Sequence, residues 1–210
     1  KVMYMASTVP EALRAVDAGA DVIIAQGTEG GGHVGWMATM VIVPMIVSAV
    51  APVPVLAAGG IADGRGFAAS LALGADGVLL GTRLLATPEA PIHENFKQAI
   101  VKSDGHDTLL TEIHDLASGQ VWPGAMARVQ RNAVIERWAG REWAIRQSQA
   151  EIWSDIAKAR RAGDADNSTL LFGQDAGLID AVRPVADIIE TMVSEADAIV
   201  RQRLAQCLRP

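Results

Sequence analysis

The sequence contains a single cysteine, Cys207, among its 210 residues. One thiol cannot form an intrachain disulfide, so the fold cannot depend on oxidative cross-links. Chains without disulfides are typical of reducing compartments, and we therefore expect a cytoplasmic protein.

Positive charge is also scarce, because 18 Lys and Arg residues stand against 24 Asp and Glu residues and leave a formal net charge of −6. This balance argues against nucleic acid or an anionic membrane surface as a general partner. Any anion that the protein binds must be held by a local site.

An uninterrupted apolar run of membrane-spanning length is missing as well. Residues 37–56 are largely apolar, but Pro44, Pro52 and Pro54 interrupt them. We predict a helix followed by a buried strand here, and no membrane span.

Several catalytic arrangements are absent from the sequence. No Ser-His-Asp or Cys-His arrangement is visible. His93, His106 and His114 occur in no Glu- or His-spaced metal-binding pattern, so we predict no metal site and assign them surface or packing roles.

A repeat is the clearest sign of organisation. Half of the residues are hydrophobic and 20% are charged, as in a globular α/β domain. Residues 19–28 resemble residues 74–82, each copy having Gly-Ala-Asp and then a short apolar run. Such runs without polar alternation are typical of strands buried on both faces of a parallel sheet. We predict neighbouring parallel strands at 2–6, 22–26, 54–58 and 78–81.

Helical patterns separate these strands. Thr8-Val9-Pro10-Glu11 has the form of a capping box, and Asp63 is a candidate N-cap for a later helix. Alternating strands and helices select a parallel α/β architecture. We predict a (β/α)₈ TIM-type barrel, which takes about 250 residues, with this chain supplying roughly its C-terminal half. Since Lys1 lies within a strand pattern and is not Met, we expect the true N-terminus to precede it.

The composition changes beyond the fourth strand. We assign residues 1–104 to the half-barrel, 105–168 to a mainly helical lobe, and 169–210 to a loop and helix that return to the barrel exterior. Four tryptophans, Trp122, Trp138, Trp143 and Trp153, are expected to pack the lobe. The last helix is expected from about Val185 to Leu204.

Two glycine motifs follow neighbouring strands. Gly59-Gly60 and Gly81-Thr82 each come at a strand end, where backbone N–H groups can approach an anion without an intervening Cβ. The alternative is that the glycines only form tight turns. Their joint occurrence after the last two strands favours a phosphate site. A shifted Gly-x-Gly-x-x-Gly pattern at 60–66 lacks the acidic residue of a dinucleotide site, so we set that interpretation aside.

A third glycine-rich loop, residues 26–35, contains His33. The backbone there can lie flat against a planar ligand. A histidine can act as a general base near neutral pH, although a structural role is the alternative. The adjacent Glu29 could act as a second acid or base, but we favour a carboxylate that is exposed to solvent or bonds backbone groups.

These motifs together resemble a known family. Gly-Thr-Glu-Gly-Gly-Gly-His-Val-Gly, Ala-Ala-Gly-Gly-Ile-Ala-Asp-Gly, Leu-Gly-Thr-Arg and the later Gly173–Ile179 segment are similar to nitronate monooxygenases (2-nitropropane dioxygenases) and to the related flavin-dependent enoyl-acyl-carrier-protein reductases. The resemblance implies FMN as cofactor and His33 as the catalytic histidine. The residues that it implies for FMN contact are Gln26, Gly31, Gly32, Ala58, Gly59, Gly60, Leu80, Gly81 and Thr82.

The leading hypothesis is FMN-dependent oxidation of an alkyl nitronate or nitroalkane by O₂, with His33 as general base or substrate-positioning residue. One alternative is an NADH-dependent FMN reductase of an enoyl thioester; another is a non-catalytic flavin-barrel fragment. A homodimer stays open. The chain departs from the family pattern at Gly30, usually Ala or Ser, and at Met5, where some members have Lys.

Overall fold

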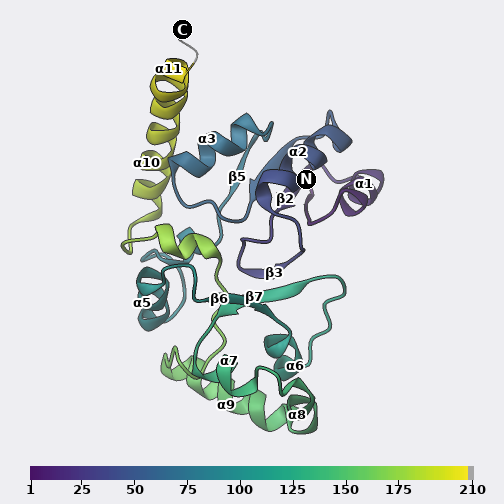
Figure 1. Ribbon diagram of the computed structural model, residues 1–210, viewed down its shortest axis with the longest axis vertical. Helices are drawn as coiled ribbons and strands as arrows, with labels where there is room; N and C mark the ends of the chain where they lie inside the picture. Colours follow the sequence, from purple (N-terminus) through teal and green to yellow (C-terminus); the bar gives the residue numbers. More distant parts are fainter. Residues whose placement is uncertain (208–210) are drawn as a thin grey trace.

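The computed structural model describes residues 1–207 and contains two separate sheets. The first has four parallel strands in the order β1-β2-β4-β5, of which Figure 1 labels β2 and β5. Their bounds are β1 Met3–Ala6, β2 Val22–Gln26, β4 Val55–Ala58 and β5 Gly77–Leu79. All four predicted strands are confirmed to within two residues, and every pairing among them is parallel.

The connecting helices begin where their capping residues predict. Helix α1 (Val9–Asp17) starts at Thr8, whose hydroxyl accepts from the Glu11 N–H while the Glu11 carboxylate accepts from the Thr8 N–H. Helix α3 (Gly64–Ala72) starts at Asp63, which accepts from two backbone N–H groups. Both caps satisfy donors that a helix end leaves unpaired.

Helix α2 (Thr39–Val50) and β4 account for the apolar run at 37–56, so the predicted helix followed by a buried strand is confirmed. Ile42, Val43 and Ile46 of α2 are fully buried against the strands. Among residues 1–207, no helix combines the length and apolar character that crossing a membrane requires.

Strand β1 departs from the expected burial. Met3, Tyr4 and Met5 are exposed, and only Ala6 at the end of the strand is buried. The prediction of a strand buried on both faces is wrong for β1 and right for the interior of β2, because β1 pairs only with β2 and lies at the sheet edge.

The second sheet was not predicted. Strands β6 (Thr108–Thr111) and β7 (Met126–Gln130) pair antiparallel within the segment expected to be mainly helical, and β7 also pairs with β3 (Gly32–Val34) of the glycine-rich loop. Local periodicity cannot reveal this sheet, since it joins short segments that lie far apart in sequence. The helices of this lobe are α6 Ile113–Ser118, α7 Ala133–Trp138, α8 Glu142–Gln147 and α9 Gln149–Ala162.

The tryptophan prediction is half right. Trp138 and Trp153 pack against the lobe's core, which includes Ile113 and Ile135. Trp143 is 61% exposed and Trp122 is 53% exposed, so neither fills that core. A count of large apolar side chains does not distinguish those directed inward from those that lie on a surface or cover another group.

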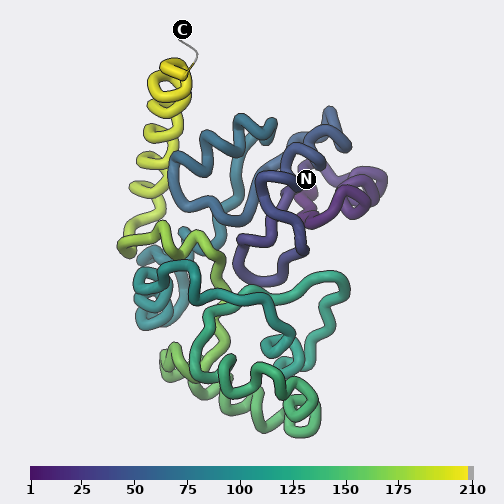
Figure 2. Tube along the Cα trace, in the orientation of Figure 1, coloured from purple at the N-terminus to yellow at the C-terminus, as the bar shows by residue number. Residues whose placement is uncertain are grey.

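The chain returns from the lobe to the first sheet through residues 169–184 (Figure 2). The remaining elements are α4 Thr82–Leu85, α5 Glu94–Lys102, the 3₁₀ turn η1 Gln174–Leu178, α10 Val185–Ala198, the π-helical segment η2 Ile199–Leu204 and α11 Ala205–Cys207. Helix α10 lies against α3, so closely that a Cβ on Gly64 would lie 2.3 Å from the Glu195 Cβ. The last helix begins at the predicted Val185 and continues through η2 to the predicted Leu204. Its expected return to the exterior of a barrel stays a prediction, and residues 208–210 of the predicted segment 169–210 lie outside the described residues.

Candidate functional site

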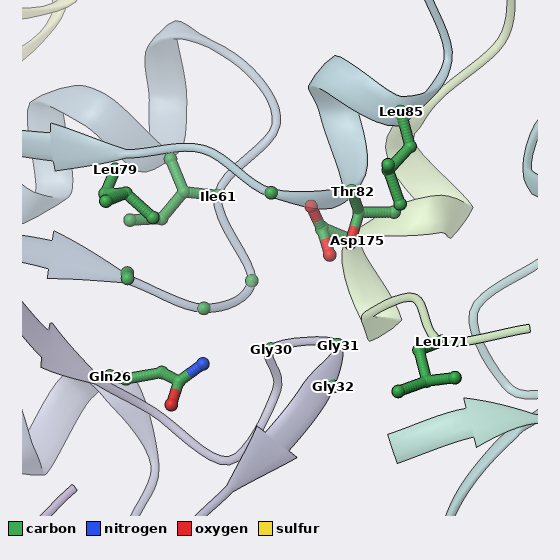
Figure 3. A pocket seen from close by; sticks show the side chains of 14 residues that line it. Gln26, Gly30, Gly31, Gly32, Ile61, Leu79, Thr82, Leu85, Leu171 and Asp175 are labelled. Carbon is green, nitrogen blue, oxygen red and sulfur yellow. The ribbon is translucent and has the colours of Figure 1, made fainter. Parts of the chain in front are cut away.

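A cleft of about 650 Å³, including space open to solvent, lies at the carboxyl ends of β2, β4 and β5 (Figure 3). Because the strands are parallel, the loops that follow them meet at this edge, where parallel α/β sheets generally bind ligands. The residues that line the cleft are Gln26, Gly30, Gly31, Gly32, Ala58, Gly59, Gly60, Ile61, Leu79, Gly81, Thr82, Leu85, Leu171 and Asp175.

The glycines after β4 are required by the geometry of the turn. Gly59 and Gly60 have φ angles of +96° and +74°, in the region that side chains disfavour. A Cβ on Gly59 would lie 2.7 Å from the Gly27 carbonyl oxygen. The two loops therefore approach each other backbone to backbone.

Gly81 has a different environment. Its φ of −107° is negative, and no atom lies within 4 Å of the position that a Cβ would take. Within residues 1–207, neither the Gly81 N–H nor the Gly60 N–H donates a hydrogen bond. The cleft therefore combines open space with unpaired backbone donors, the requirement for binding an anion.

The glycine-rich loop after β2 is held from both sides. The Glu29 carboxylate accepts from the Thr39 backbone N–H, with O···N distances of 3.0 and 3.1 Å, and from the Thr39 hydroxyl at 2.9 Å. The Arg128 Nε–H, from β7, donates to the Thr28 carbonyl oxygen at 2.9 Å. Glu29 thus bonds a backbone group, one of the two structural roles left open from the sequence, while the buried Arg128 was missed.

Eight of the nine residues expected at the flavin line this cleft, all except Leu80. Leu80 packs against the hydrophobic core, and Leu79 lines the cleft in its place. Successive side chains at a strand end point to opposite sides, so only backbone groups of Leu80 can face the cleft, and its contact with FMN stays a prediction.

His33 does not line the cleft but lies next to it in β3. Its Nε2 is 2.7 Å from Oδ1 of Asp115, and the two side chains are only 13% and 9% exposed. Its ring stacks on Trp122 with a centroid distance of 4.1 Å and an interplanar angle of 9°. In the tautomer whose Nε2 carries the hydrogen of this contact, Nδ1 is the nitrogen that remains to accept a proton.

Asp175, in η1, is the main cleft residue that the sequence did not single out. It is 5% exposed, and burial raises the pKa of its carboxyl to about 6 although a hydrogen bond with Thr82 and the charge of Arg83 oppose the rise. Figure 3 shows the carboxyl beside the Thr82 side chain. Asp175 is the single charged residue of segment 173–179, and that was the available signal.

Fold and cleft together define an α/β protein with a ligand site at the carboxyl ends of a parallel sheet. The nitronate monooxygenase family model matches residues 1–195, and the chain belongs to this family.

Individual relatives have more varied descriptions. The chain is 35% identical, over 87% of its length, to a Rhodococcus jostii protein described as a dehydrogenase of a hydroxy-methyl-oxo-octahydro-indene-carboxyl-CoA. It is similar to the structure of FabK from Thermotoga maritima, with a TM-score of 0.86, 37% identity and 98% of the chain covered. A nitroalkane oxidase from Streptomyces ansochromogenes gives a TM-score of 0.80 and 31% identity over 96% of the chain.

The chain is shorter than each of these proteins. It spans 60% of the Rhodococcus protein, 64% of the FabK chain and 58% of the nitroalkane oxidase chain.

The buried Asp175 carboxyl predicts a pH-dependent stability. Its ordinary pKa of 3.8 applies in the unfolded chain, whereas burial raises it to about 6 in the folded protein. Between these values the folded state binds more protons than the unfolded state, so stability falls as pH rises from about 4 to 6. A rise of this size corresponds to about 3 kcal/mol at most. Asp175→Asn, which does not titrate, should therefore gain stability relative to the wild type over this interval.

Urea unfolding of the two proteins at several pH values between 4 and 8 measures the difference. A difference in unfolding free energy that stays constant over this range would contradict the burial effect.

Proposed function

We propose that the chain is the FMN-binding part of a flavoenzyme that oxidises alkyl nitronates or nitroalkanes with O₂. The observation that carries this proposal is the glycine cradle, by which we mean the backbone of Gly60 and Gly81. Neither N–H group donates a hydrogen bond within residues 1–207, and the space beside Gly81 is open. A phosphate monoester needs several converging donors and no side chain in the way.

The residues of the cleft fit FMN. Gly59, Gly60, Gly81 and Thr82 would hold the phosphate, with Leu80 contributing only backbone groups. Gln26, Gly31, Gly32 and Ala58, which line the same cleft, would contact the ring system. Gly31 itself packs against the Phe172 backbone, which a Cβ would meet at 2.5 Å. When bound, the flavin supplies the electron transfer between substrate and O₂.

His33 is proposed to remove or position the substrate proton. Its Nδ1, which forms no hydrogen bond within residues 1–207, would accept the α-proton of a neutral nitroalkane, and Asp115 would pair with the resulting imidazolium across 2.7 Å. Trp122, stacked on the imidazole, restricts the ring's rotation. Asp115 is thus a positioning residue that acts through His33.

We further propose that the parallel sheet is the last half of a (β/α)₈ barrel. Strand β1 pairs only with β2 and strand β5 only with β4, so both outer edges lack a partner strand within residues 1–207. Exposed edges of this kind are normally covered. The likeness to longer solved chains supports this proposal. In it, residues 1–104 belong to the half-barrel, 105–168 to the lobe, and 169–210 to the segment that returns to the barrel. Strand β3 pairs across the first of these boundaries.

A second candidate is an NADH-dependent FMN reductase of an enoyl thioester. The CoA thioester in the name of the Rhodococcus relative and the likeness to FabK favour it. Under anaerobic conditions, the flavin absorbance of the oxidase should persist on addition of NADH and decline on addition of a nitronate. The opposite result, rapid bleaching by NADH, would favour the reductase.

Filling the cradle should prevent FMN retention. Gly81→Leu introduces a side chain where no atom lies within 4 Å, so the fold can accept it while the phosphate space closes. Loss of one hydrogen bond to a charged group, about 1.5–3 kcal/mol, should weaken FMN binding by about tenfold or more. Flavin absorbance of the purified full chain measures the effect.

Gly81→Ala is the matched control, because a methyl group fills less of the same space and should give a smaller loss. Equal melting temperatures show that the fold is intact. Wild-type flavin content in Gly81→Leu would exclude this phosphate site.

Removal of the proposed base should distinguish two substrates. A general base contributes about 10²- to 10⁴-fold to proton transfer. His33→Ala should therefore lower turnover of a neutral nitroalkane far more than turnover of its preformed nitronate, which has already lost the proton. Turnover numbers per bound FMN measure this.

Asp115→Asn should shift the same ratio in the same direction by a smaller factor, since it keeps the size of the side chain but not its charge. Equal losses with both substrates would reduce His33 to a positioning role.

A further inference from the structure

Asp175 presents a difficulty for the cleft as a phosphate site. Its carboxyl lies among the residues that line the cleft and beside the Thr82 hydroxyl (Figure 3). Thr82 Oγ1 already accepts from the Gly173 N–H at 2.8 Å, so its single hydrogen is available to the Asp175 carboxylate. Because Gly60, Gly81 and Asp175 line the same cleft, an ionised Asp175 would repel a phosphate held at the glycines.

The carboxyl has little freedom to turn away. The Gln174 N–H donates to the Glu29 carbonyl oxygen at 2.9 Å, which ties η1 to the glycine-rich loop. Even a Cβ on Gly173 would meet Oδ1 of Asp175 at 2.4 Å. The site is thus packed around Asp175 in its present orientation.

The nearest cation does not neutralise it. The Arg83 guanidinium, from α4, donates to the carbonyl oxygens of Ala86 and Ala181 at 2.9 and 2.7 Å. Its charge opposes the rise in the pKa of Asp175, but burial dominates. Within residues 1–207 no cation forms a salt bridge with Asp175.

Other charged groups around η1 are engaged elsewhere. Lys97 of α5 pairs with Glu94 and donates to the Pro88 carbonyl oxygen. Lys102, the other cation of that helix, lies in its last turn and forms no salt bridge with Asp175 within residues 1–207. Arg128 donates to the Thr28 carbonyl, and the Glu29 carboxylate accepts from Thr39. Beyond η1, Arg183 pairs with Asp180.

We propose that Asp175 couples binding of the FMN phosphate to the uptake of one proton, so that the cleft releases FMN more readily as pH rises. This inference rests on the proposed function. A like charge beside a carboxylate favours its protonated form. On binding, one proton moves from solvent to the Asp175 carboxylate, and the resulting O–H donates to a phosphate oxygen.

The direction of the effect follows from linkage. Above the pKa of the free carboxyl the protein must take up a proton to bind FMN, and each further pH unit lowers the affinity by up to tenfold. The FMN phosphate itself titrates near pH 6, as do other phosphate monoesters, so its contribution must be separated. Asp175→Asn separates it, because the variant removes the carboxyl's titration while the side chain keeps its size. The phosphate of FMN titrates in the experiment with either protein.

The experiment uses the full chain, stripped of flavin and titrated with FMN by fluorescence quenching at pH 6.5, 7.5 and 8.5. Calorimetric titrations at pH 7.5 in two buffers of different ionisation enthalpy count the protons taken up. The wild type should take up about one proton more per FMN than Asp175→Asn, and its affinity should fall about tenfold per pH unit relative to the variant.

Equal proton counts and parallel pH profiles in the two proteins would overturn the inference while leaving the flavin site intact. Should Asp175→Asn not fold, as judged by circular dichroism, the wild-type count at pH 8.5 decides, because the free phosphate is already a dianion there; zero protons overturns the inference. Absence of FMN binding by the folded wild type at every pH would instead refute the proposed function.

Discussion

The close approach of backbone to backbone at the carboxyl ends of β2 and β4 is the constraint on which the rest of the site depends. The Gly27 N–H donates to the Ala58 carbonyl at 2.9 Å, and a Cβ on Gly59 would meet the Gly27 carbonyl oxygen at 2.7 Å. Side chains are excluded from this contact, so polar backbone groups define one wall of the cleft. Such a wall offers fixed donors that need no rotamer ordering when a ligand binds.

The glycine-rich loop belongs to two structures at once. Its first residues line the cleft, and Gly32–Val34 form strand β3 of the second sheet, paired with β7. His33 is therefore placed by the lobe, through Asp115 of α6 and Trp122, whereas the neighbouring Gly31 is placed by the first sheet and by Phe172. A displacement of the lobe would move the histidine relative to the cleft, which makes this strand pairing the geometric link between the proposed base and the proposed cofactor site.

Several cleft residues owe their properties to this convergence of distant segments. Asp175 lies close to Thr82, about 90 positions earlier in the chain, and is buried by elements that no local pattern connects to it. Arg128 is buried beneath the loop that contains Thr28, although an arginine in an isolated segment is expected at a surface. Both groups have shifted pKa values for the same reason, which is burial with incomplete charge compensation.

The sequence by itself determined the four parallel strands, the caps at Thr8 and Asp63 and the start of the last helix. These depend on short-range physics, namely apolar runs and capping side chains. The resemblance to a family, not a local pattern, indicated the eight expected residues that line the cleft. Tertiary structure alone decided that β1 is exposed and that β7 pairs with both β3 and β6. It also decided that the Leu79 side chain lines the cleft, that His33 contacts Asp115, and that Asp175 is buried. Each of these is set by segments far apart in the chain, whose meeting depends on the packing of the whole fold and leaves no periodic signal in the residues themselves.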